Sequence, residues 1–222
     1  MKRIIITGAT GMVGKAVLFE AIEDERISEI LLITRTSVGI EHSKVKELLI
    51  SRFEELPNLD VSLTPYDACF HCMGVSSVGM SEKDFNQVTF KLTKILIDAL
   101  HQANPAMTVS YVSGAGTDSS EKGKVMWARV KGKTENYILN KGFKNTYMIR
   151  LGGLLPEKGI KSKTRWYNAI YFITRPLFPL LKLSKNIITT TNFGQAMINT
   201  LFFPPEKEIL ENRDLNRLAN KT

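Results

Sequence analysis

Cysteine is scarce in this chain of 222 residues, which contains only Cys69 and Cys72. Two cysteines cannot build a disulfide framework, so the fold must rest on a hydrophobic core. Both lie in an apolar run that reads as a strand, where residues three apart face opposite ways and sit about 10 Å apart. We therefore predict two core thiols, not a redox pair. No second Cys/His cluster accompanies His71, so no metal site is expected.

Long hydrophobic runs are also missing. Only three isoleucines separate Met1-Lys2-Arg3 from a glycine-rich turn, too few for the apolar part of an export signal. No segment reaches the roughly 20 apolar residues of a membrane span. The nearest, 169–183, is interrupted by Arg175, Lys182 and two prolines. These absences predict a cytoplasmic protein.

Acidic residues are outnumbered, with 22 Asp and Glu against 30 Lys and Arg, a net charge of +8. The excess is local. Residues 1–120 carry eleven basic and fifteen acidic groups, 121–144 carry seven and two, and 158–185 carry seven and none. No nucleic-acid-binding motif accounts for this charge, so nucleic acid is not an expected partner. We expect the basic segments to attract phosphate groups or an anionic small-molecule substrate.

The segment 158–185 also contains Trp166, Tyr167 and other large apolar residues. Such a mixture can lie in an anionic membrane surface. Prolines break any long helix here, so packing against the sheet is the simpler interpretation and a weak membrane contact is the alternative. The sequence leaves open whether the chain is a monomer or a homodimer.

Short β-branched runs alternate with helical segments through residues 1–155. Strands are predicted over 4–7, 30–34, 45–51, 69–73, 107–112 and 146–151, and helices over 15–24, 85–102 and 125–140. The run 45–51 is also compatible with the start of a helix. This alternation predicts an α/β fold, with a mostly parallel sheet and helices on both faces.

The pattern changes after Leu155. A short strand is predicted over 187–189, followed by a helix that Thr191 caps and that runs through Phe202, and then by a polar tail. This final part is too short for a large substrate domain. We predict a single domain over 1–222 in which 156–222 form a small cap on the substrate side.

The most informative stretch runs from Gly8 to Gly14, directly after the first strand and at the start of a helix. A glycine triplet in this position allows a tight turn, a close approach of the backbone to a pyrophosphate, and packing of the helix on the strand. The helix N-terminus offers N–H groups and a partial positive charge to the phosphates. We predict dinucleotide binding by Gly8, Ala9, Thr10, Gly11, Met12, Val13 and Gly14.

The second strand ends in Thr34-Arg35, without the acidic residue that binds the ribose in NAD sites. Arg35 lies 21 residues after Gly14, and its guanidinium suits a 2′-phosphate. The sequence therefore favours NADP over NAD. The other residues expected to bind the cofactor are Thr34, Arg35, Arg52, Met73, Gly74, Val75, Val112, Lys131, Leu151 and Gly152.

Several motifs together resemble the short-chain dehydrogenase/reductase superfamily, in the small atypical, NmrA-like branch that includes Tat-interacting-protein-like oxidoreductases. They are the glycine pattern, Cys72-Met73-Gly74, Tyr111-Val112-Ser113-Gly114, Lys131 and Ile149-Arg150-Leu151-Gly152. The resemblance covers nearly the whole chain. It implies a doubly wound Rossmann fold, a nicotinamide cofactor and often reductase activity.

The catalytic motif of that superfamily is Tyr-x-x-x-Lys, and this chain has Trp127 four residues before Lys131. An indole is not a usable acid at neutral pH. The resemblance places the catalytic serine at Gly114, beside Ser113, and Thr89 where the family often has asparagine. The catalytic candidates are Ser113, Lys131 and Trp127, with Trp127 not expected to donate a proton.

Three functions remain open. The first is an NADPH-dependent reductase of a small carbonyl, quinone or flavin-like acceptor, with the proton coming from Ser113 through Lys131, from Thr117, from Tyr167 or from water. The second is a non-catalytic NADP(H)-binding redox sensor that acts through a protein partner. A nucleotide-sugar epimerase or dehydratase is less expected, because few residues follow position 155 and the catalytic tyrosine is absent.

Overall fold

A computed structural model describes residues 1–58, 61–160, 178–181 and 184–221. Its main sheet has seven parallel strands in the order β3-β2-β1-β4-β5-β6-β9. These strands are β1 (Lys2–Thr7), β2 (Ile27–Thr34), β3 (Val45–Leu49), β4 (Ala68–His71), β5 (Thr108–Val112), β6 (Asn145–Arg150) and β9 (Ile209–Glu211). A second, two-stranded sheet pairs β7 (Gly153–Leu155) with β8 (Ile187–Thr189).

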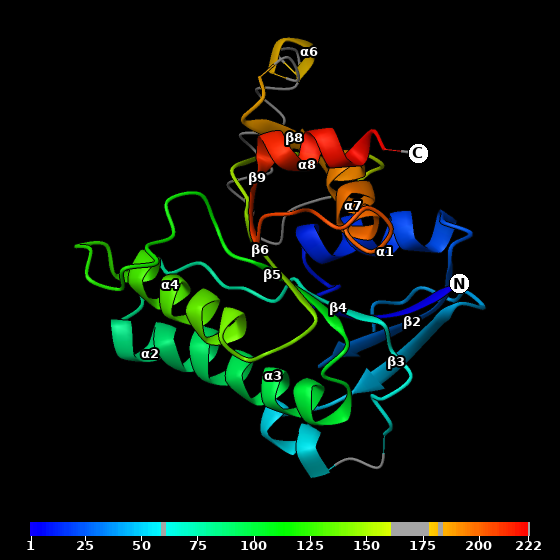
Figure 1. The fold of residues 1–222 in the computed structure, drawn as a ribbon, viewed down its shortest axis with the longest axis horizontal. Coiled ribbons are helices and arrows are strands. Elements are labelled where there is room, and N and C mark those ends of the chain that lie inside the picture. Colours follow the sequence, from blue (N-terminus) through cyan, green and yellow to red (C-terminus); the bar gives the residue numbers. More distant parts are fainter. Residues whose placement is uncertain (59–60, 161–177, 182–183, 222) are drawn as a thin grey trace.

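Helices cover both faces of the main sheet, as Figure 1 shows. One face carries α1 (Met12–Glu23), α7 (Thr190–Asn199) and α8 (Asn212–Ala219). The other carries α2 (Glu82–Asn86), the π-helical turn η2 (Gln87–Lys91), α3 (Leu92–Ala103) and α4 (Met126–Leu139). The remaining short helices are η1 (Phe53–Asn58) and α6 (Phe178–Leu181). The doubly wound, mostly parallel α/β architecture predicted from the sequence is confirmed.

Strand β1 shows why this sheet is buried on both faces. Ile4 and Ile6 belong to the core cluster under α1 and α7, whereas Ile5 belongs to the cluster under α3. A central parallel strand needs apolar side chains on both sides, which explains the uninterrupted isoleucines. Cys69 lies in the second cluster and Cys72 packs against the first, and both are free thiols, as predicted.

Several predicted boundaries are wrong; among them, the strand predicted over 69–73 ends at His71 and the helix predicted through Phe202 ends at Asn199. Helix α1 begins at Met12 and not Lys15, because the last residues of the glycine-rich turn already form its first helical turn. The N-cap of α7 is Thr189 and not Thr191; its Oγ1 accepts a hydrogen bond from the Asn192 N–H at 3.2 Å. The helix predicted over 85–102 is interrupted by η2, which apolar spacing cannot reveal.

The polar tail predicted after Pro205 contains a strand and a helix. Strand β9 pairs with β6 at the sheet edge, and α8 follows behind a capping box formed by Glu211 and Asp214. A three-residue edge strand is too short to give a periodic signal. The described residues from β8 to α8 thus add to the sheets and to the helix layer. The substrate-side cap over 156–222 stays a prediction, and Tyr167 lies outside the described residues.

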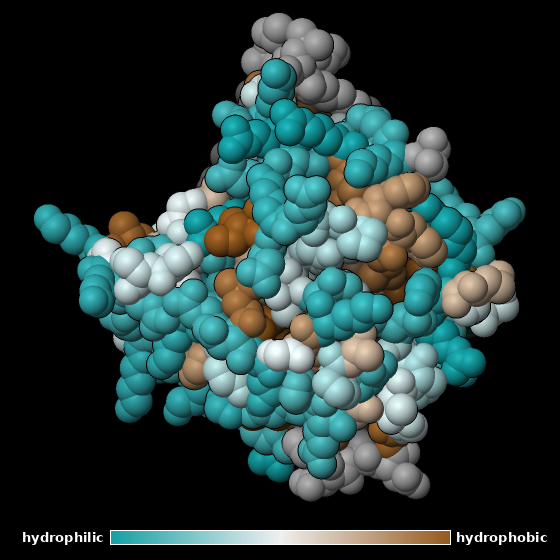
Figure 2. Space-filling model, in the orientation of Figure 1, coloured by the Kyte–Doolittle hydropathy of each residue, from teal (hydrophilic) through white to brown (hydrophobic). Residues whose placement is uncertain are grey.

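The surface of the protein is mixed in character. Figure 2 shows a mainly hydrophilic face with separate apolar patches. Within the part of the chain that the structure describes, no helix is both long and apolar enough to cross a bilayer. Most of the basic aromatic segment 158–185 lies outside the described residues, so its membrane contact remains a prediction.

Candidate functional site

The turn between β1 and α1 requires glycine at two positions. Gly8 has a φ of +74°, and a Cβ there would lie 2.6 Å from the Cys72 carbonyl oxygen. A Cβ on Gly14 would lie 2.4 Å from the Gly8 carbonyl oxygen. Gly11 differs, because its Cβ would meet only that oxygen, at 3.4 Å. Side chains at positions 8 and 14 would therefore push α1 and the loop after β4 away from the turn.

The N-terminus of α1 is built to accept an anion. Its N-cap, Gly11, provides no capping side chain, and its first turn contains no acidic residue. Neither the cap nor the first turn therefore supplies an anion to the first-turn N–H groups and to the partial positive charge of the helix. Ala9 is buried, while Met12 and Val13 pack partly against the core. This cradle fits the phosphates of a dinucleotide.

The order of the strands reverses between β1 and β4, which are neighbours in the sheet. Open α/β sheets bind ligands outside the carboxyl ends of their strands at such a point. The Cys72 N–H donates to the Thr7 carbonyl oxygen at 3.2 Å, so the loop after β4 lies against the glycine-rich turn. A Cβ added to Gly74 would meet no atom of the described residues within 4 Å, and Val75 is exposed. Met73 instead packs partly against the core.

The end of β2 lies next to β1 on the same edge. Thr34 is buried, and its Oγ1 donates to the Thr36 carbonyl oxygen at 2.9 Å. Arg35 is exposed. Arg52, after β3, is also exposed, and its Nε donates to a Glu55 carboxylate oxygen at 3.0 Å. Of the two arginines expected to bind the cofactor, Arg52 therefore already has a carboxylate partner.

Three segments converge on Gly114, in the loop after β5. A Cβ on Gly114 would have the Trp127 ring at 3.9 Å, the Leu151 carbonyl oxygen at 4.0 Å and the Lys131 Nζ at 4.0 Å. Trp127 and Lys131 are one helical turn apart on α4, so they share a face. The structure thus brings together the catalytic candidates that the sequence indicated, at the carboxyl ends of β5 and β6.

Ser113 is turned toward the interior. Its Oγ donates to Glu135 Oε1 at 2.6 Å and lies 3.3 Å from the Ile149 carbonyl oxygen. Glu135 is fully buried and forms an ion pair with Arg150 of β6, with Nη2 and Oε2 2.7 Å apart. Neither Glu135 nor Arg150 was expected to shape the site. The available signal was the spacing of four between Lys131 and Glu135, which puts both on one face of α4.

Lys131 is half-buried, and its Nζ donates to the Ser113 carbonyl oxygen at 3.0 Å. Burial lowers the pKa of Lys131 to about 8, and the negative charge of Glu135 opposes that shift. The Thr117 hydroxyl donates to the Gly114 carbonyl oxygen at 2.7 Å. Thr89, on η2, is buried, and among the described residues its Oγ1 has no hydrogen-bond partner.

The loop after β6 is held by a residue of α8 that the sequence did not single out. The Gly152 N–H donates to Asn212 Oδ1 at 2.9 Å. Asn212 Nδ2 donates to the carbonyl oxygens of Gly153 and Asn186. These bonds fix the backbone of Leu151 and Gly152, two expected cofactor residues, next to Val112 at the end of β5.

His71 behaves as a strand residue. Hydrogen bonds join its Nδ1 to Thr7 Oγ1 at 2.6 Å and its Nε2 to Thr93 Oγ1 at 2.9 Å. Burial lowers its pKa to about 3, so the ring is neutral. In the described part of the chain no group of three potential metal ligands occurs.

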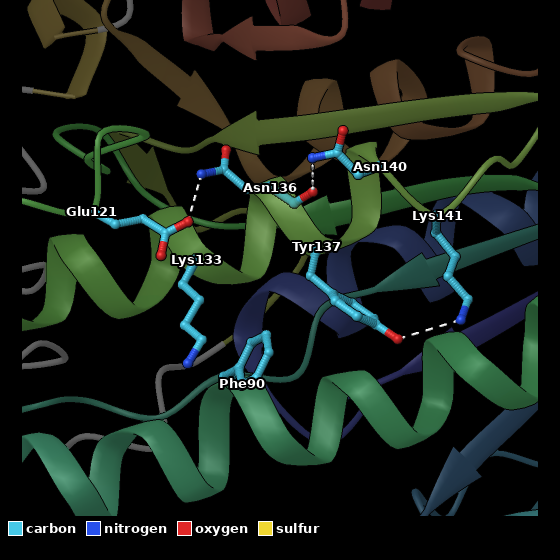
Figure 3. Close-up of a pocket in the computed structure, with 7 residues that line it drawn as sticks. All are labelled: Phe90, Glu121, Lys133, Asn136, Tyr137, Asn140 and Lys141. Atoms are coloured by element: carbon cyan, nitrogen blue, oxygen red, sulfur yellow. Dashed lines mark hydrogen bonds between the residues drawn. The ribbon is translucent and has the colours of Figure 1, made fainter.

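A groove of about 410 Å³ lies on a different face of α4 and is shown in Figure 3. Tyr137 and Phe90 form an edge-to-face pair there, with ring centroids 5.7 Å apart. Lys141 donates to the Asp98 carboxylate, and Asn136 donates to Glu121. Because its polar side chains are paired in this way and it lies away from Lys131, we do not assign the groove to the cofactor site.

Comparison with known proteins now identifies the family. The model of the "NAD dependent epimerase/dehydratase family" matches residues 4–138, which include the glycine-rich turn and Lys131. The chain belongs to this family. The match confirms the resemblance to the short-chain dehydrogenase/reductase superfamily and the nicotinamide-cofactor-dependent class.

The chain is also similar to individual known proteins. It is 25% identical over 224 residues to Protein HTATIP2 of Rattus norvegicus, covering 98% of this chain and 89% of that protein. The WbmH enzyme of Bordetella bronchiseptica, solved in complex with NAD+, superposes with a TM-score of 0.66 at 14% identity, over 91% of this chain and 72% of WbmH. The UDP-N-acetylglucosamine 4-epimerase of Bacillus cereus gives 0.65 at 18% identity, over 98% and 84%. These structures show the shared fold.

Proposed function

We propose that this protein is an NADP(H)-dependent oxidoreductase that reduces a small carbonyl, quinone or flavin-like acceptor. The observation that carries the proposal is the position of two groups of residues on one sheet edge. The glycine cradle follows β1, and the Gly114 cluster with Lys131 follows β5, two strands away across the switch point. A cofactor that spans this edge would be held at its phosphates by the turn before α1 and at its reactive end by the residues around Lys131.

Lys131 is the proton donor in this proposal. Ser113 and Thr117 donate their hydroxyl hydrogens inward, and the Trp127 indole is not an acid at neutral pH. The ammonium of Lys131 has three hydrogens, of which one forms the hydrogen bond to the Ser113 carbonyl oxygen. With a pKa of about 8, it is close to the operating pH at which a general acid works best.

The reduction of a carbonyl group then balances. When bound, a reduced nicotinamide cofactor would supply the hydride, and with it two electrons, for the carbonyl carbon. Lys131 Nζ gives a proton to the carbonyl oxygen, and the neutral amine takes a proton back from water. One carbonyl, one hydride and one proton yield one alcohol.

Arg35 supports the choice of NADP over NAD, since it is exposed at the end of β2 where no acid is present. Arg35→Ala is expected to weaken NADPH binding about tenfold, the worth of one charge-assisted contact. NADH binding should change little, because NADH has no 2′-phosphate. Fluorescence titration with both cofactors measures the effect. An equal loss for NADPH and NADH would refute the assignment of Arg35.

A phenol at position 127 should improve turnover of a carbonyl acceptor. The double variant Trp127→Tyr/Gly114→Ser is expected to raise kcat about tenfold, less than the usual effect of a general acid because Lys131 already donates. Serine fits at 114, since the nearest atoms would lie at 3.9 Å or beyond. The matched control is Trp127→Phe/Gly114→Ser, which has the ring without the hydroxyl. A similar gain in the control would contradict the acid role of the phenol.

A non-catalytic NADP(H) sensor that acts through a protein partner is the second candidate function. Trp127 and Gly114, at the positions of the family's tyrosine and serine, favour it. NADPH oxidation should be followed with carbonyl, quinone and flavin acceptors, alongside calorimetric titration with NADPH and NADP+. Turnover above background supports the reductase. Unequal affinities together with a change in oligomeric state, but no turnover, support the sensor.

A further inference from the structure

The ion pair between Glu135 and Arg150 is unusual because it is largely buried. The Glu135 side chain is 0% exposed, and the Arg150 side chain is 18% exposed. Arg150 contacts both carboxylate oxygens, with Nε at 3.2 Å and Nη2 at 2.7 Å. Burying such a pair costs several kcal/mol per ion before its mutual attraction is counted, so a well-packed apolar pair would serve stability at least as well.

The carboxylate of Glu135 has a second partner in Ser113, which supplies its third hydrogen bond. The Ser113 Oγ donates its hydrogen to Glu135 Oε1 at 2.6 Å, a short bond of the charge-assisted kind. A hydroxyl has one hydrogen, so the Ser113 oxygen offers only lone pairs to any other neighbour. Ser113 can then accept a hydrogen bond but cannot supply the proton for a reduction.

Lys131 lies one turn before Glu135 on the same face of α4, and its Nζ is bonded to the Ser113 carbonyl oxygen. Ser113 is thus held at its hydroxyl by Glu135 and at its carbonyl by Lys131. Arg150 from β6 and Tyr111 from β5 both interact with Glu135. The negative charges of Asp118 and Glu211 help to raise the pKa of Arg150. Among the described residues, the negative charge of Glu135 opposes the lowering of the Lys131 pKa by burial.

We propose that Glu135 is a positioning residue of the reduction site: it holds the hydroxyl hydrogen of Ser113, keeps Lys131 charged, and thereby assigns proton donation to the lysine. This inference rests on the proposed oxidoreductase function for its catalytic meaning. Its electrostatic part does not depend on that function, because it concerns only charges of this chain, those of Glu135, Lys131 and Arg150. Arg150 offsets the charge of Glu135, which allows the carboxylate to remain in the core.

The test replaces Glu135 by its neutral isostere in Glu135→Gln. Loss of the negative charge destabilises the ammonium, so the pKa of Lys131 should fall by about one unit, a tenfold change in the protonation equilibrium. NMR titration of the lysine side chains in the cofactor-free protein measures this, with Lys131→Met identifying the resonance. The descending limb of kcat against pH should move to lower pH by the same amount.

Glu121→Gln is the matched control. Glu121 is exposed, precedes α4 and accepts a hydrogen bond from Asn136, which points to a different side of α4 than Lys131, so the Lys131 titration should stay unchanged. If Glu135→Gln fails to fold with Arg150 left unpaired, Glu135→Gln/Arg150→Met removes both charges and should give a smaller shift in the same direction. A Lys131 titration unmoved in the folded Glu135 variant overturns the inference. Absence of cofactor binding by the wild-type chain would instead overturn the proposed function.

Discussion

A chain with alanine at position 14 is expected to lose measurable dinucleotide binding, with an affinity for NADPH at least about a thousandfold weaker, or 4 kcal/mol. The added Cβ would lie 2.4 Å from the Gly8 carbonyl oxygen and 2.8 Å from the Ala9 Cα, so α1 must move off the turn. These neighbours are backbone atoms, which cannot rotate away. Overpacking of this kind also costs about 1–3 kcal/mol of folding stability. Fluorescence titration and thermal unfolding measure the two effects.

Gly11→Ala is the informative comparison for Gly14→Ala. A Cβ on Gly11 would meet only the Gly8 carbonyl oxygen, at 3.4 Å, so this variant should keep the wild-type Tm. Any loss of NADPH affinity in Gly11→Ala then reports the approach of the phosphates to the turn and not a disturbed fold. The cradle assignment is wrong if Gly14→Ala folds and binds NADPH within threefold of wild type.

The glycine-rich turn and β1 could be predicted because both depend on local sequence. Three isoleucines in a row suit a strand buried on two faces, and the glycine spacing reflects contacts between residues 8 and 14. The edge strand β9 could not be predicted in the same way. Its three residues join the sheet because β6 offers a free edge, which is a property of the assembled fold.

The site residues likewise fall into two groups, those that a local motif predicts and those that only the folded structure brings together. Lys131 and Trp127 were found from a motif, since one helical turn separates them. Glu135 was not, because in the sequence it is one charge among several on a helix rich in lysine. Its burial depends on Ser113, which directly follows β5, and on Arg150 of β6, and no local pattern connects either residue to α4. The same limit applies to Asn212, which holds Gly152 from 60 residues away.

Lys131→Met is expected to reduce kcat about a hundredfold to a thousandfold, within the range of a lost general acid. Methionine keeps most of the length of the side chain but has neither the proton nor the charge. Lys131→Arg separates these two properties. A guanidinium stays protonated above pH 12, so it preserves the positive charge near the cofactor but does not release a proton. NADPH affinity should therefore be retained better in Lys131→Arg than in Lys131→Met, while kcat falls to a similar extent in both.

The pH dependence of kcat provides an independent test of the role of Lys131. The pKa of Lys131 is lowered to about 8, so the wild-type ammonium is lost, and kcat should decline, as the pH rises through that value. The residual activity of Lys131→Arg should lack this decline, because no group at position 131 titrates in the range. Steady-state rates from pH 6 to 10 at saturating NADPH, with affinities measured in parallel, distinguish the two cases. If Lys131→Arg retains kcat within threefold of wild type, Lys131 holds the cofactor and another group supplies the proton.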